Sequence, residues 1–498
     1  MTSTSPGGPA GPGTDHVDVL VVGAGLSGIG VAQHLQRRRP HSTYAIVESR
    51  DRLGGTWDLF RYPGVRSDSD MHTLGYRLRP WKDARAIADG PAILAYVEDT
   101  AREEGIDRHI RYGVRVVRAE FCTADARWTV DLHHGATGET STMTCGFLFS
   151  CSGYYDYDQG FTPDFAGVAE FGGIVVHPQQ WPAGLDTTGK KVVVIGSGAT
   201  AVTLVPALAE TAEHVTMLQR SPTYVVSLPR TDMVAERARK LLPARAAFAL
   251  VRWKNVAKTS ASYALSRSRP GLMRRLLRKG VVAALPEGYD VDTHFNPRYD
   301  PWDQRLCVVP NGDLFRAISA GKASVVTDHV ETFTPTGIRL RSGAELAADV
   351  IVTATGLNLL AFGGITFVVD GEEADLRRSM AYRSMMLTGL PNFAFALGYT
   401  NASWTLKVDL TANYICRLLD HMDFAHQAVA APLRDPAVRE EPFLNFAAGY
   451  VQRSISAFPH QGDVAPWRVS MSYPRDLAAL RRASVTEGMS FPTPAAAR

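Results

Sequence analysis

The pattern of apolar and polar residues near the start of the chain predicts a strand, a tight turn and a helix. Residues 16–35 read "HVDVLVVGAGLSGIGVAQHL", in which an apolar run leads into glycines and then into apolar residues at helical spacing. A second apolar run, "TYAIVES" at 43–49, carries Glu48 near its end. Strands that alternate with helices in this way are typical of a parallel α/β sheet.

The same pattern occurs again in the middle of the chain. Residues 190–208, "KKVVVIGSGATAVTLVPAL", are followed by a strand-like run, "HVTMLQRS", at 214–221. Two more apolar runs, 147–153 and 349–356, end in small residues and frame this second unit. We therefore predict an α/β fold with two Rossmann-like dinucleotide-binding domains.

Between 226 and 299 the pattern changes to helical apolar spacing with many Lys and Arg residues, which predicts a helical insertion. Its basic face is either a solvated helix face or a surface for weak membrane association. The predicted organisation is a disordered tail at 1–16, a first domain at 17–158 and 358–498, a second domain at 159–225 and 300–357, and the insertion at 226–299.

The first glycine-rich turn has the spacing G-x-G-x-x-G at Gly23, Gly25 and Gly28, and Glu48 follows the last glycine by twenty residues. Glycines let the backbone approach a pyrophosphate at a helix N-terminus, where the helix dipole favours anions. Glu48 is placed to accept hydrogen bonds from a ribose hydroxyl. This site suits FAD.

The second turn differs in its third position and in the strand that follows. Gly196 and Gly198 are present, but Ala201 replaces the third glycine, and the next strand ends in Gln219 and Arg220 without an acid. The lack of an acid removes repulsion of a 2′-phosphate, and arginine binds phosphate. This site suits NADPH, although Arg220 is alternatively a solvated surface charge. The residues predicted to bind NADPH are Gly196, Ser197, Gly198, Ala199, Thr200, Ala201, Gln219 and Arg220.

Composition excludes several other classes. The 498 residues suggest two or three domains, and a net charge of +3 is too small to imply nucleic-acid binding. No long apolar run predicts a transmembrane segment, and no signal-peptide pattern is present, so we expect a cytoplasmic protein. The histidines lack metal-site spacing, so we expect no metal. Five scattered cysteines favour reduced thiols: Cys122, Cys145, Cys151, Cys307 and Cys416.

An aromatic segment, "GGTWDLFRYPGVRSD" at 54–68, follows the first unit. Pyridine-nucleotide disulfide reductases, which share the two-site architecture, carry a redox cysteine in a Gly-Gly-Thr-Cys setting here. This chain has Trp57 at that position, so its electrons do not leave through a dithiol. We expect the indole to pack over the flavin and exclude water.

Two motifs resemble those of Baeyer–Villiger monooxygenases. The first is matched in 54–68 by Gly54, Gly55, Trp57, Tyr62, Pro63, Gly64 and Asp68. The second is matched in "FGGIVVHPQQWP" by Phe171, Gly173, His177, Trp181 and Pro182. The resemblance covers about 17–490 and is greatest to the ethionamide-activating actinobacterial monooxygenases.

This resemblance implies an NADPH- and FAD-dependent monooxygenase that acts through a peroxyflavin. One oxygen atom of dioxygen is inserted next to a ketone carbonyl to give an ester or lactone, and sulfides or thioamides are oxidised as well. The alternative is a flavin-containing monooxygenase that acts only on nitrogen and sulfur, a family that lacks the Trp-Pro ending of the second motif. A non-catalytic flavin sensor is a further alternative from a different class.

The resemblance also assigns roles to residues. Arg305 aligns with the catalytic arginine of the family, although many relatives have Lys-Arg-Pro where this chain has Gln304-Arg305-Leu306. Asp68 would pair with Arg305, or else would cap a loop. His177 is expected to act in domain movement and not as a base. Trp404, Asn401 and Ser403 are expected at the flavin ring. The predicted FAD residues are Gly23, Gly25, Ser27, Gly28, Glu48, Thr56, Trp57, Asp58, Leu59, Asp68 and Val116.

Overall fold

The first sheet is built from both ends of the chain. The computed structural model describes residues 15–444 and 448–493. The strand order is β20-β19-β4-β5-β6-β1-β2-β3, and β23 also pairs with β6. β1 is parallel to both β2 and β6, and its apolar run is buried because layers cover both faces. The strands are β1 (Asp15–Val22), β2 (Tyr44–Val47), β3 (Ile110–Arg111), β4 (Val114–Cys122), β5 (Arg127–His134), β6 (Thr140–Ser150), β19 (Thr366–Val369), β20 (Glu372–Glu373) and β23 (Phe393–Phe395).

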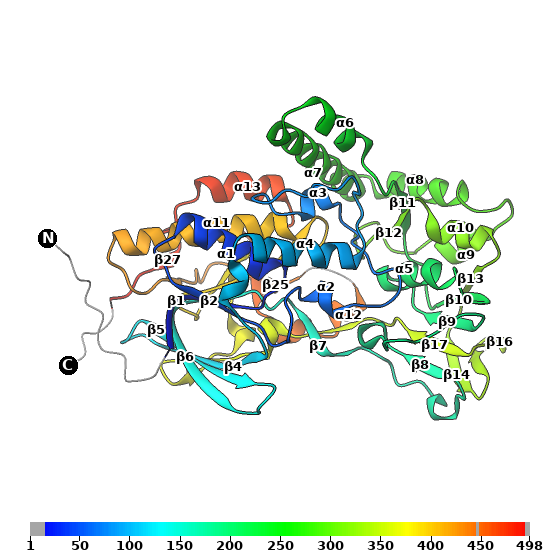
Figure 1. The fold of residues 1–498 in the computed structure, drawn as a ribbon, viewed down its shortest axis with the longest axis horizontal. Helices are drawn as coiled ribbons and strands as arrows, with labels where there is room; N and C mark the ends of the chain where they lie inside the picture. Colours follow the sequence, from blue (N-terminus) through cyan, green and yellow to red (C-terminus); the bar gives the residue numbers. More distant parts are fainter. Residues whose placement is uncertain (1–14, 445–447, 494–498) are drawn as a thin grey trace.

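Helices from distant parts of the sequence cover this sheet together (Figure 1): α1 (Leu26–Arg38), α4 (Gly90–Glu103), α11 (Trp404–Phe424) and α13 (Tyr473–Arg482). Leu35 of α1 and Leu406, Ile415 and Leu418 of α11 belong to one buried core. Charged pairs add to this packing, because Arg39 NH1 lies 2.7 Å from an Asp420 carboxylate oxygen. The C-terminal part of the chain therefore completes the first unit.

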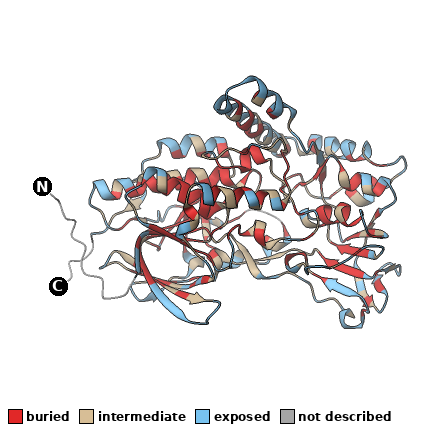
Figure 2. Ribbon diagram, viewed as in Figure 1, coloured by how far each residue is buried: buried red, intermediate tan, exposed pale blue. Residues whose placement is uncertain are grey.

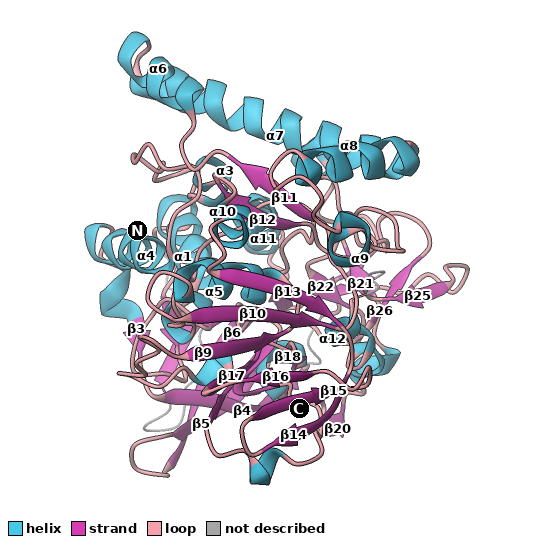
Figure 3. Cartoon of the chain, turned by 90° about the vertical axis from the view of Figure 1, so that its right-hand side faces the viewer, coloured by secondary structure: helices cyan, strands magenta, loops and turns pink. Residues whose placement is uncertain are grey.

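The second sheet is fully parallel, with the order β13-β10-β9-β17-β8 (Figure 3). Its central strand β9 has the sequence KVVVI and is buried after its first residue. The elements are β8 (Ile174–Val176), β9 (Lys191–Ile195), α5 (Ala199–Leu208), β10 (His214–Gln219), α10 (Asp313–Ser319), β13 (Ala323–Thr327) and β17 (Val350–Thr353). An antiparallel sheet lies beside it, made of β14 (Val330–Thr334), β15 (Gly337–Leu340) and β16 (Glu345–Ala347).

Two antiparallel segments, β7 (Tyr155–Gly160) and β18 (Leu357–Leu359), carry the chain between the two units. The remaining short elements are α2 (Thr56–Leu59), α3 (Met71–Leu74), α12 (Gly449–Gln452), β21 (Ala381–Tyr382), β22 (Met386–Leu387), β24 (Ala431–Pro432), β25 (Glu440–Pro442), β26 (His460–Gly462) and β27 (Met489–Ser490).

The helical insertion forms a separate layer over the two units, made of α6 (Met233–Leu241), α7 (Ala244–Ser268) and α8 (Pro270–Val282), and α9 (Val291–Phe295) lies between α8 and the second unit. Much of its outer surface is exposed (Figure 2). The buried guanidinium of Arg252 fixes α7 to α3 by donating to the carbonyl oxygens of His72 and Gly75 at 3.2 and 3.1 Å. Among the described residues, no helix combines the length and apolarity that crossing a bilayer requires.

Two predicted boundaries differ from the structure. The insertion was expected to begin at 226, but 225–228 form β11 (Val225–Leu228), which pairs with β12 (Cys307–Pro310), and the first helix begins at Met233. Short strands are hard to recognise when their partner lies some eighty residues away. Of the predicted tail, 1–14 lie outside the described residues, whereas 15 and 16 begin β1. All five cysteines are free thiols, as expected.

Candidate active site

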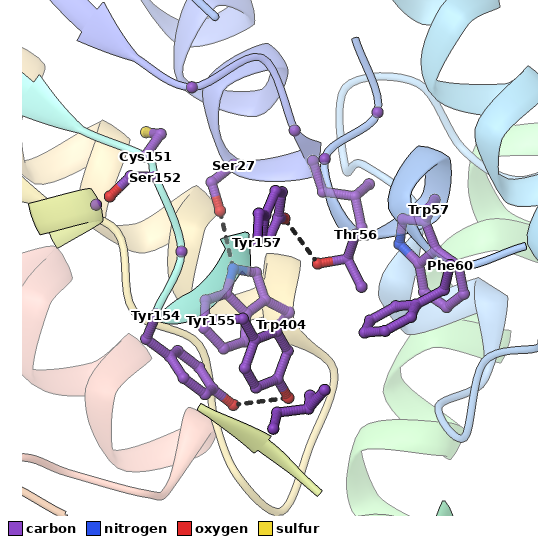
Figure 4. Close-up of a pocket in the computed structure, with 18 of the residues that line it drawn as sticks. Ser27, Thr56, Trp57, Phe60, Cys151, Ser152, Tyr154, Tyr155, Tyr157 and Trp404 are labelled. Atoms are coloured by element: carbon purple, nitrogen blue, oxygen red, sulfur yellow. Dashed lines mark hydrogen bonds between the residues drawn. The ribbon is translucent and has the colours of Figure 1, made fainter. Parts of the chain in front are cut away.

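A cleft of about 360 Å³ lies along the carboxyl ends of β1, β2 and β6 and reaches α5 of the second unit. In parallel α/β sheets this end of the strands is where ligands bind. Figure 4 shows the aromatic residues that line it. The cleft brings together many of the predicted site residues, namely Gly23, Gly25, Ser27, Glu48, Thr56, Trp57, Asp68, Val116, Ala199, Thr200 and Arg305.

Two positions of the first glycine-rich turn, Gly23 and Gly28, have no room for a side chain. Gly23 has φ +101°, and a Cβ atom there would lie 2.7 Å from the carbonyl oxygen of Cys151. A Cβ atom on Gly28 would lie 1.9 Å from the carbonyl oxygen of Gly23. Gly25 precedes α1 without a side-chain cap, so the first amides of the helix face the cleft without competition from a side chain. The turn fits a pyrophosphate.

Glu48 is buried at the end of β2 and is fixed by the turn that it faces. Its Oε2 accepts a hydrogen bond from the amide of Ala24 at 2.8 Å, and its Oε1 accepts one from the amide of Arg50 at 3.0 Å. Burial raises the pKa of the Glu48 carboxyl, whereas these two hydrogen bonds oppose the shift. The carboxylate is therefore preorganised at the cleft wall, where a ribose hydroxyl can reach it.

The segment with Gly54 and Gly55 packs directly against this turn. Gly54 has φ +115° and Gly55 has φ +56°, and a Cβ atom on Gly55 would lie 3.1 Å from the Cα of Gly25. The paired glycines thus permit a close approach of two backbones. They place Trp57 at the cleft, and Thr56 Oγ1 lies 3.1 Å from the hydroxyl of Tyr157 (Figure 4).

The second glycine-rich turn is as close to its neighbouring strand at its first glycine as the first turn is, but it is open at its second glycine. Gly196 has φ +140° and lies against Ala354, but a Cβ atom on Gly198 would meet no atom within 4 Å. Arg220 is exposed at the end of β10. Gln219 does not share that position, because its Nε2 donates to Thr327 Oγ1 at 2.9 Å inside the fold. Successive side chains in an extended chain point to opposite sides. The side chains of Gln219 and Arg220 therefore face opposite ways.

Several predicted residues do not line the cleft. Gly28 lies behind the first turn, and Asp58 is buried between the guanidinium groups of Arg50 and Arg61. Asp58 therefore stabilises the segment and does not face a ligand. The others outside the lining are Leu59 and, in the second unit, Gly196, Ser197, Gly198, Ala201, Gln219 and Arg220.

Arg305 and Asp68 form an ion pair at the cleft wall, as the resemblance implied. Arg305 Nε lies 2.8 Å from Asp68 Oδ2, and a second nitrogen lies 3.4 Å from Oδ1. The carboxylate raises the pKa of the guanidinium above its already high value, so the cation is permanent. The Arg305 side chain is 35% exposed and reaches the cleft.

Tyrosines near this pair were not identified from the sequence. The hydroxyls of Tyr154 and Tyr155 are 3.5 Å apart, and the Tyr154 ring lies 5.4 Å from that of Trp404 (Figure 4). Burial raises the pKa of Tyr154 and of Tyr450, and the nearby Arg305 cation opposes both shifts. The two adjacent tyrosines directly follow the apolar run at 147–153, and this position after a parallel strand was a signal that pointed to the site.

Two family models match parts of the chain. Residues 21–86 match the NAD(P)-binding Rossmann-like domain, and residues 85–273 match the flavin-binding monooxygenase-like family. The FAD-containing monooxygenase EthA of Mycobacterium tuberculosis (strain ATCC 25618 / H37Rv) is 56% identical over 483 residues, which cover 96% of this chain and 98% of EthA. The chain belongs to the EthA family of FAD-containing monooxygenases.

This EthA-family chain shares its overall fold with solved monooxygenases of low sequence identity. A steroid monooxygenase bound to NADP has a TM-score of 0.74 at 22% identity, covering 95% of this chain and 99% of that one. OTEMO in complex with FAD and NADP has a TM-score of 0.71 at 23% identity, covering 84% and 87%. The predicted α/β fold with two dinucleotide-binding units is confirmed.

His177 of this EthA-family protein lies outside the cleft, where the chain crosses between the units. Its Nδ1 accepts a hydrogen bond from the amide of Gln179 at 3.1 Å, so Nε2 carries the proton and donates to the carbonyl oxygen of Gly356 at 3.1 Å. A Cβ atom on Gly160 would lie 1.9 Å from the imidazole. Burial lowers the pKa of His177, which keeps the ring neutral. Contact with both crossing segments suits a hinge.

Of the three residues expected at the flavin ring, only Trp404 lines the cleft; its Nε1 donates to Ser27 Oγ at 2.8 Å. Asn401 instead donates to the carbonyl oxygen of Met471 at 3.0 Å. The Ser403 hydroxyl lies 2.6 Å from that of Thr73. The two side chains therefore fix the loop before α11 to the segments that contain Met471 and Thr73. Their position in the sequence does not reveal these contacts.

Proposed function

We propose that the protein is an FAD- and NADPH-dependent Baeyer–Villiger monooxygenase. It inserts one oxygen atom of dioxygen next to a ketone carbonyl to give an ester or lactone, and it also oxidises sulfides or thioamides. The observation that carries this proposal is the Arg305–Asp68 pair, a permanent cation fixed at the wall of a cleft that also holds the first glycine-rich turn. Membership of the EthA family supports it.

The residues of the two turns fit the two cofactors. The first turn and Glu48 would hold the pyrophosphate and ribose of FAD, and Arg220 would bind the 2′-phosphate of NADPH. When bound, the two cofactors supply the hydride and the activation of dioxygen. Ala199 and Thr200 at the start of α5 line the same cleft, so a nucleotide at this helix would extend toward the first unit.

Arg305 provides the electrostatic part of the reaction. Negative charge develops on the reacting oxygen atoms during insertion next to a carbonyl, and a fixed guanidinium stabilises such charge without reorganisation. Asp68 holds the guanidinium in one orientation through its two contacts. A fully enclosed ion pair with Asp68 would leave the guanidinium little charge to offer a ligand. The Arg305 side chain is partly exposed, so its remaining guanidinium N–H groups are available to the cleft.

Tyr154 supplies a neutral hydroxyl group near this cation, and the hydroxyl of Tyr155 lies 3.5 Å from the Tyr154 hydroxyl. Burial raises the pKa of Tyr154, so its hydroxyl keeps its proton at neutral pH and can donate a hydrogen bond. Trp57, Phe60 and Trp404 line the same cleft with apolar surface (Figure 4). Such surface excludes water from the reacting groups and strengthens the interactions inside the cleft.

A panel of ketones and sulfides tests the proposal, with purified FAD-loaded protein, NADPH and dioxygen. We expect esters or lactones from some ketones and sulfoxides from sulfides, with one labelled oxygen atom incorporated from ¹⁸O₂. Formation of sulfoxides without ester from any ketone would favour a monooxygenase restricted to nitrogen and sulfur. If the protein neither oxidised NADPH nor formed product, the result would favour a flavin-binding sensor.

A further inference from the structure

Exposed apolar side chains are concentrated on the helical layer formed by α6, α7 and α8. Seventeen large apolar side chains are exposed among the described residues, and nine of them lie between 233 and 282. They are Met233, Val234, Leu241, Leu242, Leu250, Trp253, Leu272, Leu276 and Val282. Scattered exposed apolar residues need no explanation, but a concentration in one layer indicates an interaction surface.

The same layer has a strongly one-sided charge. Residues 233–282 contain a single acid, Glu236, against thirteen basic residues: Arg237, Arg239, Lys240, Arg245, Arg252, Lys254, Lys258, Arg267, Arg269, Arg274, Arg275, Arg278 and Lys279. The chain as a whole has a net charge of only +3, so this basic surface is local. It is complementary to an anionic partner.

Part of this charge has internal partners and part has none. Lys254, Arg267, Arg274 and Arg278 pair with aspartates, and Arg239 and Arg252 donate to backbone carbonyl oxygens. Seven side chains are exposed and, within the described ranges, have no carboxylate at ion-pair distance: Arg237, Lys240, Arg245, Lys258, Arg269, Arg275 and Lys279. The fold therefore does not require these seven cations.

The turn between α6 and α7 combines both features at a projecting point (Figures 1 and 3). It reads Lys240-Leu241-Leu242-Pro243-Ala244-Arg245, and Leu241 is 81% exposed. Pro243 precedes α7 and fixes the turn, so the two leucines are held outward between two cations. A free polyanion or an acidic protein surface offers charge for the cations but no acyl layer for the leucines.

We propose that this helical layer is a docking surface for anionic phospholipid membranes. The α6–α7 turn inserts Leu241 and Leu242 among the lipid acyl chains, and the surrounding Lys and Arg side chains bind the anionic headgroups. Peripheral proteins use this combination of apolar insertion and basic charge, because neither alone gives stable binding. The attachment is reversible and places the helical layer, and not the cleft between the units, on the membrane.

Flotation of the full-length, FAD-loaded protein with vesicles tests the proposal. We expect binding to vesicles of phosphatidylcholine mixed with phosphatidylglycerol, weak binding to phosphatidylcholine alone, and release at high salt. The double variant Leu241→Ser/Leu242→Ser should weaken binding roughly tenfold or more through lost apolar burial. The variant Arg237→Glu/Lys240→Glu/Arg245→Glu should weaken it roughly a hundredfold, at about fivefold per cation removed.

Matched controls come from other faces of the molecule. Phe424→Ser removes a side chain that is 87% exposed at the end of α11. The triple variant Lys322→Glu/Arg341→Glu/Arg378→Glu reverses exposed charges outside the layer. Both controls should bind vesicles as the unaltered protein does, and all variants should keep their flavin and their turnover of a soluble substrate.

Four results would overturn the proposal. The first is no preference of the unaltered protein for anionic vesicles. The second is binding that survives both turn variants. The third is sensitivity to the charge reversals with no effect of the leucine changes, because that pattern describes a general polyanion site; competition by soluble heparin at low concentration would show the same. Loss of binding in the two control variants would likewise exclude this surface as the determinant.

Discussion

The two glycine-rich turns have the same sequence pattern but differ in how closely the rest of the fold surrounds them. In the first, Gly25 lies against Gly55, Gly28 lies under Gly23, and Glu48 bonds to the turn. In the second, a side chain on Gly198 would meet nothing, no acid follows, and Arg220 is exposed. A tightly enclosed turn suits a cofactor that stays bound, whereas an open turn suits one that must exchange in every catalytic cycle.

The largest effect on product formation is expected from a change at Arg305, which leaves both glycine-rich turns unaltered. Arg305→Ala should lower product formation about a thousandfold or more, because the preorganised cation at the cleft wall is lost. FAD should stay bound, since the first turn is unchanged, so the protein should remain yellow and folded. Arg305→Lys should recover only part of the activity because it lacks the planar fork that Asp68 binds.

Turnover of an accepted ketone, measured together with the flavin spectrum, checks this expectation. Near-normal turnover in the alanine variant would mean that another group supplies the cation. Loss of flavin in the same variant would mean that Arg305 is needed for the fold and would leave its electrostatic role without support.

The enclosed turn should not tolerate a single methyl group. Gly28→Ala places a Cβ atom 1.9 Å from the carbonyl oxygen of Gly23, so the turn must shift. A strain of about 3 kcal/mol would lower FAD affinity roughly a hundredfold. Gly198→Ala, at the second glycine of the open turn, is the control and should leave both cofactors bound, because a Cβ atom there meets no atom within 4 Å. Equal sensitivity of the two turns, measured by FAD content and NADPH affinity, would remove the contrast between them.

The open turn should depend on Arg220 for its choice of nucleotide. Arg220→Ala should weaken NADPH binding by about 1.5–3 kcal/mol, roughly ten- to a hundredfold, while NADH binding hardly changes. Arg341→Ala, another exposed arginine, is the control. Michaelis constants for the two nucleotides give the measurement. An equal loss for both would show that the guanidinium does not bind the 2′-phosphate.

The smallest effect is expected from a change at Trp57, which lines the cleft beside the enclosed turn. Trp57→Ala should admit water to the cleft and raise release of hydrogen peroxide roughly two- to fivefold at similar NADPH consumption. Trp57→Phe should stay close to the unaltered protein, because it keeps an apolar ring. Peroxide and product measured in the same reaction would decide; unchanged coupling in the alanine variant would reject the shielding role.

Local features of the sequence were sufficient to predict the two units. A buried strand, a glycine turn and a helix require only neighbouring residues, and the pairing of Asp68 with Arg305, 237 residues apart, was inferred only through the family resemblance. Tyr154 and Tyr155 were missed because residue type alone does not distinguish a cleft tyrosine from a core tyrosine; only their position directly after the apolar run at 147–153 pointed to the site. Which way a strand residue faces also depends on its partners, as the inward amide of Gln219 shows.

The sequence alone determined the α/β class, the two glycine-rich turns and the basic helical character of 233–282. These properties are set by the period of apolar residues and by backbone conformations that only glycine adopts easily. Tertiary structure decided that residues 404–424 return to pack on α1, that Asp58 is enclosed by two arginines, and that the basic helices expose their apolar residues. Such facts depend on which distant surfaces meet, and the burial gained by that meeting is not encoded in any short stretch of the chain.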